Sequence, residues 1–285
     1  MNIQQIKITD YGFPDTLKNI PFPPKQLYYT GNLDLLSYQI LLSIVGSRRV
    51  SIYGRECTYN IAFECAGQGI GIVSGLALGV DAIAHRACLD AGGVAIAVLA
   101  CGLDKLYPAT NARLGQEILN NGGLIISEYA EGTEPFPGNF IARNRLVSGL
   151  SRATLITEAA KNSGTLHTSR FAMEQGKTVM AVPGNITSPT SAATNHLLRT
   201  GAEPITGPGD VLAFFGLTDH IRRQTVKADN PDEAALIKLL KQGMTDAADL
   251  MSHSFLGAAS FNQTLTMLEI NGKIRPLGAG HWSLN

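Results

Sequence analysis

The sequence has no long apolar segment and few cysteines. Its longest uncharged apolar stretch, Val94–Leu103, is too short to span a bilayer, and the N-terminal MNIQQIKITD has neither the basic nor the apolar region of a secretion signal. We therefore expect a cytoplasmic protein without a membrane segment. The four cysteines form no Cys-x-x-Cys pair, which argues against a zinc site or a disulfide framework; they are Cys57, Cys65, Cys88 and Cys101.

The sequence also lacks an excess of charge of either sign. Lysine plus arginine and aspartate plus glutamate each number 23 in 285 residues, so the formal net charge is +0. Binding of a polyanion would therefore have to depend on a local cluster of basic side chains. The length is sufficient for one large domain and one small one.

Common catalytic and metal-binding motifs are absent. Gly176-Lys177-Thr178 resembles the end of a P-loop, but Phe171 stands where that motif needs its first glycine. The chain has no G-x-S-x-G and no H-E-x-x-H, and its six histidines are scattered without the spacing of metal ligands. The sequence therefore indicates no metal site.

Short apolar stretches alternate with segments of helical length from Leu41 to Ile205. This alternation predicts an α/β fold, with a Rossmann-like, mostly parallel sheet of six or seven strands and helices on both faces. We assign this domain to residues 37–217 and expect the proline-rich residues 1–36 to form an irregular arm packed on it, with one short strand at Leu27–Tyr29. The expected strands are 41–45, 70–73, 94–100, 124–127, 154–157, 178–182 and 203–205, and the expected helices are 51–68, 79–91, 111–121, 140–150, 165–175, 194–200 and 210–215.

The C-terminal part has a different character. After a polar linker at 218–231, residues 232–285 are expected to form three helices, the second capped by Thr245, and then a hairpin of 273–277 with 281–284. This order is typical of a winged-helix domain. Residues 229–285 carry four basic and six acidic side chains, and the third helix has no Lys or Arg. The domain is therefore better suited to binding protein, or to packing, than to reading DNA.

The stretch Ile70–His85, IGIVSGLALGVDAIAH, predicts a buried strand, a turn and a helix. Gly75 and Gly79 allow a sharp turn or the close approach of a ligand, and the following helix would direct free N–H groups toward that turn, as in a phosphate site. A plain strand-to-helix corner would show the same residues. Asp81 and His85 are four residues apart on this helix, so we expect a stabilising contact between them rather than proton transfer.

Small and hydroxyl-bearing residues follow several of the predicted strands. They include Gly46-Ser47-Arg48, Ser74-Gly75 and Ser163-Gly164-Thr165, and the carboxyl ends of parallel strands meet at one edge of a sheet. Arg143-Asn144-Arg145 adds two guanidinium groups, which are suited to bidentate contact with phosphate. This set favours a polyanionic ligand. The alternative is a pair of surface arginines that form salt bridges.

A series of segments resembles the DprA (Smf) family of DNA-processing proteins in order and spacing. These are VGSRRVSIYG, VSGLALGVDAIAHRACLDAGG, LACGLDKLYPATN, ISEYAEGTEPFPGNFIARNRLVSGLS, TEAAKNSGTLHTSRFAMEQGKTVMAVPGNITSP and TNHLLRTGA. The resemblance covers Tyr11 to about Phe215, and the tail is similar to the winged-helix domain of many members.

The resemblance implies a protein that forms homodimers and binds single-stranded DNA without sequence specificity. Members protect the strand and load RecA recombinase onto it in natural transformation, with no established catalytic activity, and the resemblance implies no cofactor. It also implies a phosphate pocket made of Gly46, Ser47, Arg48, Ser74, Gly75, Arg143, Asn144, Arg145, Ser163, Gly164 and Thr165.

Two other functions compete with this one. Nucleoside-monophosphate phosphoribohydrolases have a similar turn, GGxGTxxE, but Thr168 stands where their glutamate would supply the carboxylate chemistry. A sensor could instead bind a small nucleotide in the same pocket and signal through the winged helix.

Overall fold

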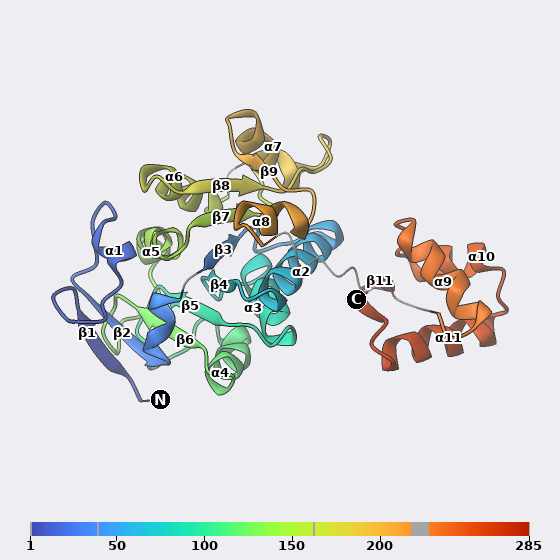
Figure 1. The fold of residues 1–285 in the computed structure, drawn as a ribbon, viewed down its shortest axis with the longest axis horizontal. Helices are drawn as coiled ribbons and strands as arrows, with labels where there is room; N and C mark the ends of the chain where they lie inside the picture. The colour runs from blue at the N-terminus through green and yellow to red at the C-terminus, as the bar shows by residue number, and fades with distance from the viewer. Residues whose placement is uncertain (1, 39, 162, 218–227, 285) are drawn as a thin grey trace. The chain divides into compact units, whose positions relative to one another are not determined.

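The computed structural model describes residues 2–38, 40–161, 163–217 and 228–284. The chain divides into two compact units, Met1–His220 and Ile221–Asn285, which are described separately (Figure 1). Most of the predicted linker, 218–231, lies outside the described residues. In the part of the chain that is described, no helix combines the length and the apolar character needed to cross a membrane.

The first unit is built on a nine-stranded sheet with the order β1-β2-β6-β5-β4-β3-β7-β8-β9. The predicted parallel part is confirmed, and it has seven strands. Its inner strands are buried at every residue, which explains why they are continuous apolar runs rather than alternating ones. The parallel strands are β3 (Leu41–Val45), β4 (Gly71–Ser74), β5 (Ala95–Leu99), β6 (Leu124–Ser127), β7 (Ala153–Ile156), β8 (Thr178–Ala181) and β9 (Glu203–Pro204).

The N-terminal arm adds two antiparallel strands to this sheet. β2 (Gln26–Gly31) pairs with β6, and β1 (Gln4–Lys7) pairs with β2. The expected strand at Leu27–Tyr29 is confirmed within β2, but the arm also forms β1, so the expectation that the rest of it is irregular was wrong. Without the arm, β6 would be an edge strand with unpaired N–H and C=O groups, and β2 satisfies them.

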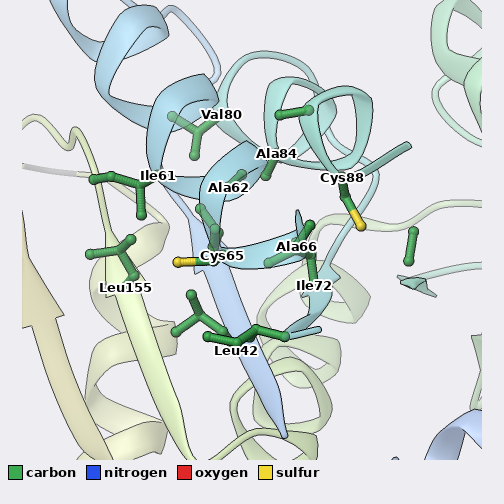
Figure 2. Packing of buried hydrophobic residues seen from close by; sticks show 14 of the residues in the cluster. Leu42, Ile61, Ala62, Cys65, Ala66, Ile72, Val80, Ala84, Cys88 and Leu155 are labelled. Carbon is green, nitrogen blue, oxygen red and sulfur yellow. The ribbon is translucent and has the colours of Figure 1, made fainter. Parts of the chain in front are cut away.

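Helices cover both faces of the sheet, as predicted. One face is covered by α2 (Ile52–Gly67), α3 (Val80–Asp90), α4 (Ala112–Asn120) and α8 (Pro208–Phe214). The other is covered by α1 (Asp15–Lys18), α5 (Pro137–Leu150), α6 (Thr165–Glu174) and α7 (Ala192–Arg199). Figure 2 shows α2 and α3 packed through small side chains over Leu42, Ile72 and Leu155 of the sheet, with Cys65 and Cys88 among the packed residues. All four cysteines are free thiols.

The order of the strands places a switch point at β3. The chain runs from β3 outward through β4, β5 and β6, and then crosses to β7 on the other side of β3. The helices that follow β3 and β7, which are α2 and α6, therefore lie on opposite faces of the sheet. Such a point opens a crevice at the carboxyl ends of the two strands, where α/β proteins bind their ligands.

The second unit has the predicted three helices and hairpin. They are α9 (Pro231–Lys241), α10 (Ala247–Ser254), α11 (Ala258–Ile270), β10 (Ile274–Gly278) and β11 (His281–Leu284), and they share one apolar core. The cap of α10 is Asp246 and not Thr245: Asp246 Oδ1 accepts hydrogen bonds from the N–H groups of Ala248 and Asp249. Thr245 instead accepts a bond from the N–H of Trp282 in the hairpin.

Candidate functional site

A cleft of about 1130 Å³ lies at the switch point of the sheet. It is lined by the loop between β3 and α2, the loop between β7 and α6, and the start of α5. The predicted site residues that line it are Gly46, Ser47, Arg48, Arg143, Asn144, Ser163, Gly164 and Thr165. Ser74, Gly75 and Arg145 are not among the lining residues.

The β3–α2 loop presents two arginines at the cleft. Ser47 fixes the loop, because its N–H donates to the Glu158 carbonyl at 2.7 Å and its hydroxyl accepts from the N–H of Arg49 at 3.1 Å. Arg48 and Arg49 are both exposed, and neither forms an ion pair within the described ranges. The Arg48 guanidinium lies over the Phe140 ring, 5.2 Å from its centroid. Arg49 was not predicted as a site residue, although it directly follows Arg48.

The β7–α6 loop is tied to the β3–α2 loop by hydroxyl groups. Ser163 Oγ accepts from the N–H of Thr165 at 3.2 Å and donates to Thr165 Oγ1 at 2.9 Å. Thr165 Oγ1 in turn donates to the Gly46 carbonyl at 3.0 Å. On the other side, Asn144 Nδ2 lies 3.5 Å from the Gly164 carbonyl oxygen. The first turn of α6 is thus held at the cleft from two directions.

A buried carboxylate occupies the N-terminus of α2. Glu158, which follows β7 and is 2% exposed, accepts from the Ser51 N–H at 2.8 Å and from the Ser51 hydroxyl at 2.6 Å. Ser51 is the N-cap of α2. The negative charge therefore lies where the helix dipole favours an anion. Glu158 was not predicted as a site residue.

The hydrogen-bonding groups of the Ser74–Gly75 turn have partners within the protein. The Ser74 hydroxyl donates to the Ile44 carbonyl at 2.6 Å, and the N–H groups of Gly75 and Ala77 donate to Asp81 Oδ2 at 3.1 and 3.4 Å. The N–H groups of this turn are therefore used by the side chain of Asp81, and the N–H of Val80, at the start of the helix predicted to face a phosphate, donates to the Ser47 carbonyl at 3.1 Å.

The two glycines of this stretch make room for protein atoms. A Cβ on Gly75 would lie 2.4–2.6 Å from atoms of the Arg143 guanidinium. Gly79 has φ +78°, and a Cβ there would lie 2.2 Å from the Ser47 carbonyl oxygen. Both glycines are thus explained by close packing between chain segments rather than by the approach of a ligand.

The two arginines of the predicted pair have different environments. Arg143 is 4% exposed, and its Nη1 donates to the Gly75 carbonyl at 2.8 Å and to the Val98 carbonyl. Arg145 Nη2 instead lies 2.7 and 2.8 Å from the two carboxylate oxygens of Glu128. The structure does not bring the two guanidiniums together at the cleft: Arg143 lines it, and Arg145 forms a salt bridge, as in the alternative interpretation.

The expected contact between Asp81 and His85 is not formed. Asp81 accepts bonds from the preceding turn, and neither ring nitrogen of His85 has a hydrogen-bond partner among the described residues. His85 is 0% exposed, and its burial lowers its pKa to about 3; the Ser74 backbone opposes this shift, and the positive charge of Arg143 adds to it. Burial raises the pKa of Asp81, and the positive charge of Arg143 opposes that shift.

Aromatic and apolar side chains line the α5 side of the cleft. The rings of Tyr107 and Phe140 lie 5.7 Å apart between centroids and are tilted by 58°. Ile141, Pro135 and Pro137 line the same side. Sequence reasoning assigned none of these residues to the site. Across the described ranges, no group of three or more His, Cys, Asp or Glu side chains could hold a metal ion.

Comparison with known proteins gives consistent matches over both units. Residues 4–216 match the family model of DNA recombination-mediator protein A, and residues 222–280 match that of the DprA winged helix domain. The DNA processing protein DprA of Streptococcus pneumoniae is 42% identical over 208 residues, which are 73% of each chain. Protein Smf of Escherichia coli is 42% identical over 196 residues, which are 68% of this chain and 52% of the relative, so this chain spans about half of that protein.

A solved structure agrees with these matches. It is described as giving insight into the single-stranded DNA binding mode of DNA processing protein A from Helicobacter pylori. Its TM-score is 0.68 at 34% sequence identity, and the match covers 75% of this chain and 95% of that chain.

Proposed function

The chain belongs to the DNA recombination-mediator protein A (DprA/Smf) family, and on this premise we propose that it binds single-stranded DNA in the cleft at the switch point of its sheet. The binding is independent of base sequence and involves no catalysis. We assign it to residues 37–217.

The observation that carries this proposal is the unpaired positive charge of the β3–α2 loop. Arg48 and Arg49 line the cleft, are exposed and form no ion pair within the described ranges. The two nearest carboxylates, Asp81 and Glu158, accept bonds from groups of the protein. A chain with a formal net charge of +0 thus has a local cluster that attracts phosphate.

The apolar side of the cleft favours binding of a single strand over binding of a duplex. Tyr107 and Phe140 offer ring surfaces within the same cleft as the arginines. Bases stack on aromatic side chains only when they are free of the duplex, and stacking is tolerant of sequence. The combination therefore suits an unpaired strand whose backbone contacts the arginines.

The hydrogen bonds of the Asp81 and Glu158 carboxylates support a cleft without catalytic activity. Glu158 is bonded to Ser51, and Asp81 to the turn before α3. Thr168 lines the cleft at the position where a phosphoribohydrolase would carry its glutamate. Neither of these two carboxylates is thus free to transfer a proton to a leaving base.

The biological role follows from family membership. We propose that the chain acts as a homodimer in the cytoplasm, protects incoming single strands during natural transformation and loads RecA recombinase onto them. Residues 232–285, which carry no basic residue on α11, are proposed to contact protein rather than DNA.

Salt dependence of binding tests the role of the two arginines. Each phosphate contact on a single strand contributes about −0.7 to the slope of log affinity against log salt. Arg48→Ala and Arg49→Ala should each make the slope shallower by about that amount, measured by fluorescence anisotropy with a labelled oligothymidylate. Arg113→Ala is the matched control, because Arg113 is an exposed arginine on α4 outside the cleft.

Two outcomes would contradict the proposal. Binding of duplex as tight as that of the single strand would exclude a site for unpaired bases, and unchanged slopes in both arginine variants would place the DNA on another surface.

Incubation with AMP tests the enzymatic alternative, because release of free base would show glycosidic cleavage.

A further inference from the structure

Carboxylates of the protein lie at the starts of two helices beside the cleft, α2 and α3. Glu158 binds the N-cap of α2, and Asp81 binds the turn before α3. A third helix, α6, has ten residues and no acidic residue in its first turn. The Gly164 N–H at its start has no acceptor among the described residues. The N–H groups of Thr165 and Leu166 donate to Ser163, so among the described residues of this turn the Gly164 N–H is left for an external anion.

Gly164 has no structural reason to be a glycine. Its φ of −57° and ψ of −17° are open to any residue, and a Cβ added there would meet nothing within 4 Å. At Gly46, by contrast, the missing Cβ would lie 2.6 Å from Val80 Cγ2, and at Gly75 it would lie against Arg143. The absence of a side chain at Gly164 leaves open space that faces the cleft.

Thr168 supplies a second, independent indication of a ligand at this place. Its side chain lines the cleft, yet the residue is only 2% exposed, and its hydroxyl has no hydrogen-bond partner among the described residues. It lies four positions after Gly164, so it shares that face of α6, and helical side chains lean toward the N-terminus of their helix. The residue is almost completely buried and lines the cleft, so its hydroxyl, which has no partner among the described residues, is available to a ligand there.

We propose that one phosphodiester group of the bound strand lies over Gly164, where it accepts hydrogen bonds from the Gly164 N–H and the Thr168 hydroxyl. Thr168 is then a specificity-determining residue, because its neutral donor admits a phosphate that a carboxylate at the same position would repel. Ser74 and Gly75 contact no phosphate. This inference rests on the proposed function and names the position of a phosphate within that site.

Three variants test the phosphate position by anisotropy with a labelled oligothymidylate. Thr168→Val removes the hydroxyl at constant shape and should weaken binding about tenfold, the usual effect of losing a hydrogen bond to a charged group. Thr168→Ser keeps the hydroxyl and should bind within about threefold of the parent protein. Gly164→Ala fills the open space and should weaken binding about tenfold or more, with an unchanged unfolding midpoint.

Two controls match these variants. Gly207→Ala changes the glycine before α8, which also has open space around it but does not line the cleft. Thr154→Val removes a buried hydroxyl of β7 that has no partner and lies outside the cleft. Neither control should alter the affinity for the strand.

The outcomes separate this inference from the proposed function. Failure of the parent protein to bind the oligothymidylate would contradict the proposed function itself. Tight binding by the parent together with unchanged binding by Thr168→Val and Gly164→Ala would overturn only the phosphate position. A peptide nucleic acid of the same sequence has no phosphate, so a loss of affinity for that strand in either variant would also overturn it.

Discussion

Replacement of Arg143 by methionine should destabilise the first unit rather than remove a contact with DNA. The guanidinium is buried, with Nη1 bonded to the carbonyls of Gly75 and Val98, and it fills the space left by the missing Cβ of Gly75. Methionine keeps an unbranched apolar stem, but it is shorter than arginine and has no donor. The two carbonyls would then lose the Arg143 donor, and Asp81 would lose the positive charge that opposes the effect of its burial.

The expected cost can be derived from these contacts. Each buried carbonyl without a donor costs about 1–3 kcal/mol. Removal of one partner from a buried charged network costs about 3–5 kcal/mol in total, so we expect the free energy of unfolding to fall by about that amount. Arg143→Lys keeps the positive charge but not the planar, forked guanidinium, and should lower the free energy of unfolding by about half as much as Arg143→Met. Because Arg143 and Asp81 interact, Asp81→Asn combined with Arg143→Met should cost less than the sum of the single variants.

Urea unfolding followed by intrinsic fluorescence can measure this effect in the first unit. All eight tyrosines lie before residue 218 and the single tryptophan, Trp282, lies in the second unit. In a Trp282→Phe background, tyrosine emission therefore reports the first unit alone. A free energy of unfolding for Arg143→Met within about 0.5 kcal/mol of the parent value, the range of an ordinary surface substitution, would refute the structural role. Arg143 would then be available as a direct ligand of phosphate.

Two further predictions concern buried positions near the cleft. Gly46→Ala should lower the free energy of unfolding by about 1–3 kcal/mol, because its Cβ would lie 2.6 Å from Val80 Cγ2 and 2.7 Å from the Glu158 carbonyl oxygen; an unchanged urea midpoint would show that the loop moves aside without cost. His85 is neutral when folded, because burial lowers its pKa from 6.5 to about 3. The unfolded chain takes up that proton below pH 6.5, so His85 should contribute a loss of about 2 kcal/mol in stability between pH 7 and pH 5. His85→Leu should remove this part of the acid sensitivity, and equal losses in both proteins over that interval would contradict the assignment.

The inner sheet could be predicted because burial on both faces leaves a clear pattern. Leu41–Val45 and Leu124–Ser127 were expected as strands and are β3 and β6 with the same bounds. β1 has the sequence QQIK with a single buried residue, so no apolar pattern marks it. Its strand conformation depends on pairing with β2, which itself depends on the free edge of β6. That information lies in the tertiary structure and not in the local sequence.

The N-cap of α10 and the pair of Arg143 and Arg145 show two different limits of prediction from the sequence. Thr245 and Asp246 are adjacent and both suited to capping, and the choice is made by the hairpin, whose Trp282 N–H bonds the Thr245 carbonyl. The separation of Arg143 from Arg145 could have been found. The predicted helix 140–150 contains both residues, and a spacing of two places them about 200° apart around a helix. The two side chains therefore could not both face the cleft.

The three glycines predicted for the phosphate pocket explain why the site could be predicted from the sequence while the position of the phosphate within it could not. Gly46, Gly75 and Gly164 each follow a strand and look alike in sequence. The Cβ space of Gly75 is filled by Arg143 and that of Gly46 by Val80, from segments distant in the chain, whereas the space at Gly164 is open. Replacement by alanine therefore has one effect at a glycine required by packing and another at a glycine that admits a ligand. Alanine at a filled position costs stability, and alanine at the open position costs affinity, so the phosphate lies at the glycine whose substitution lowers binding without lowering the free energy of unfolding.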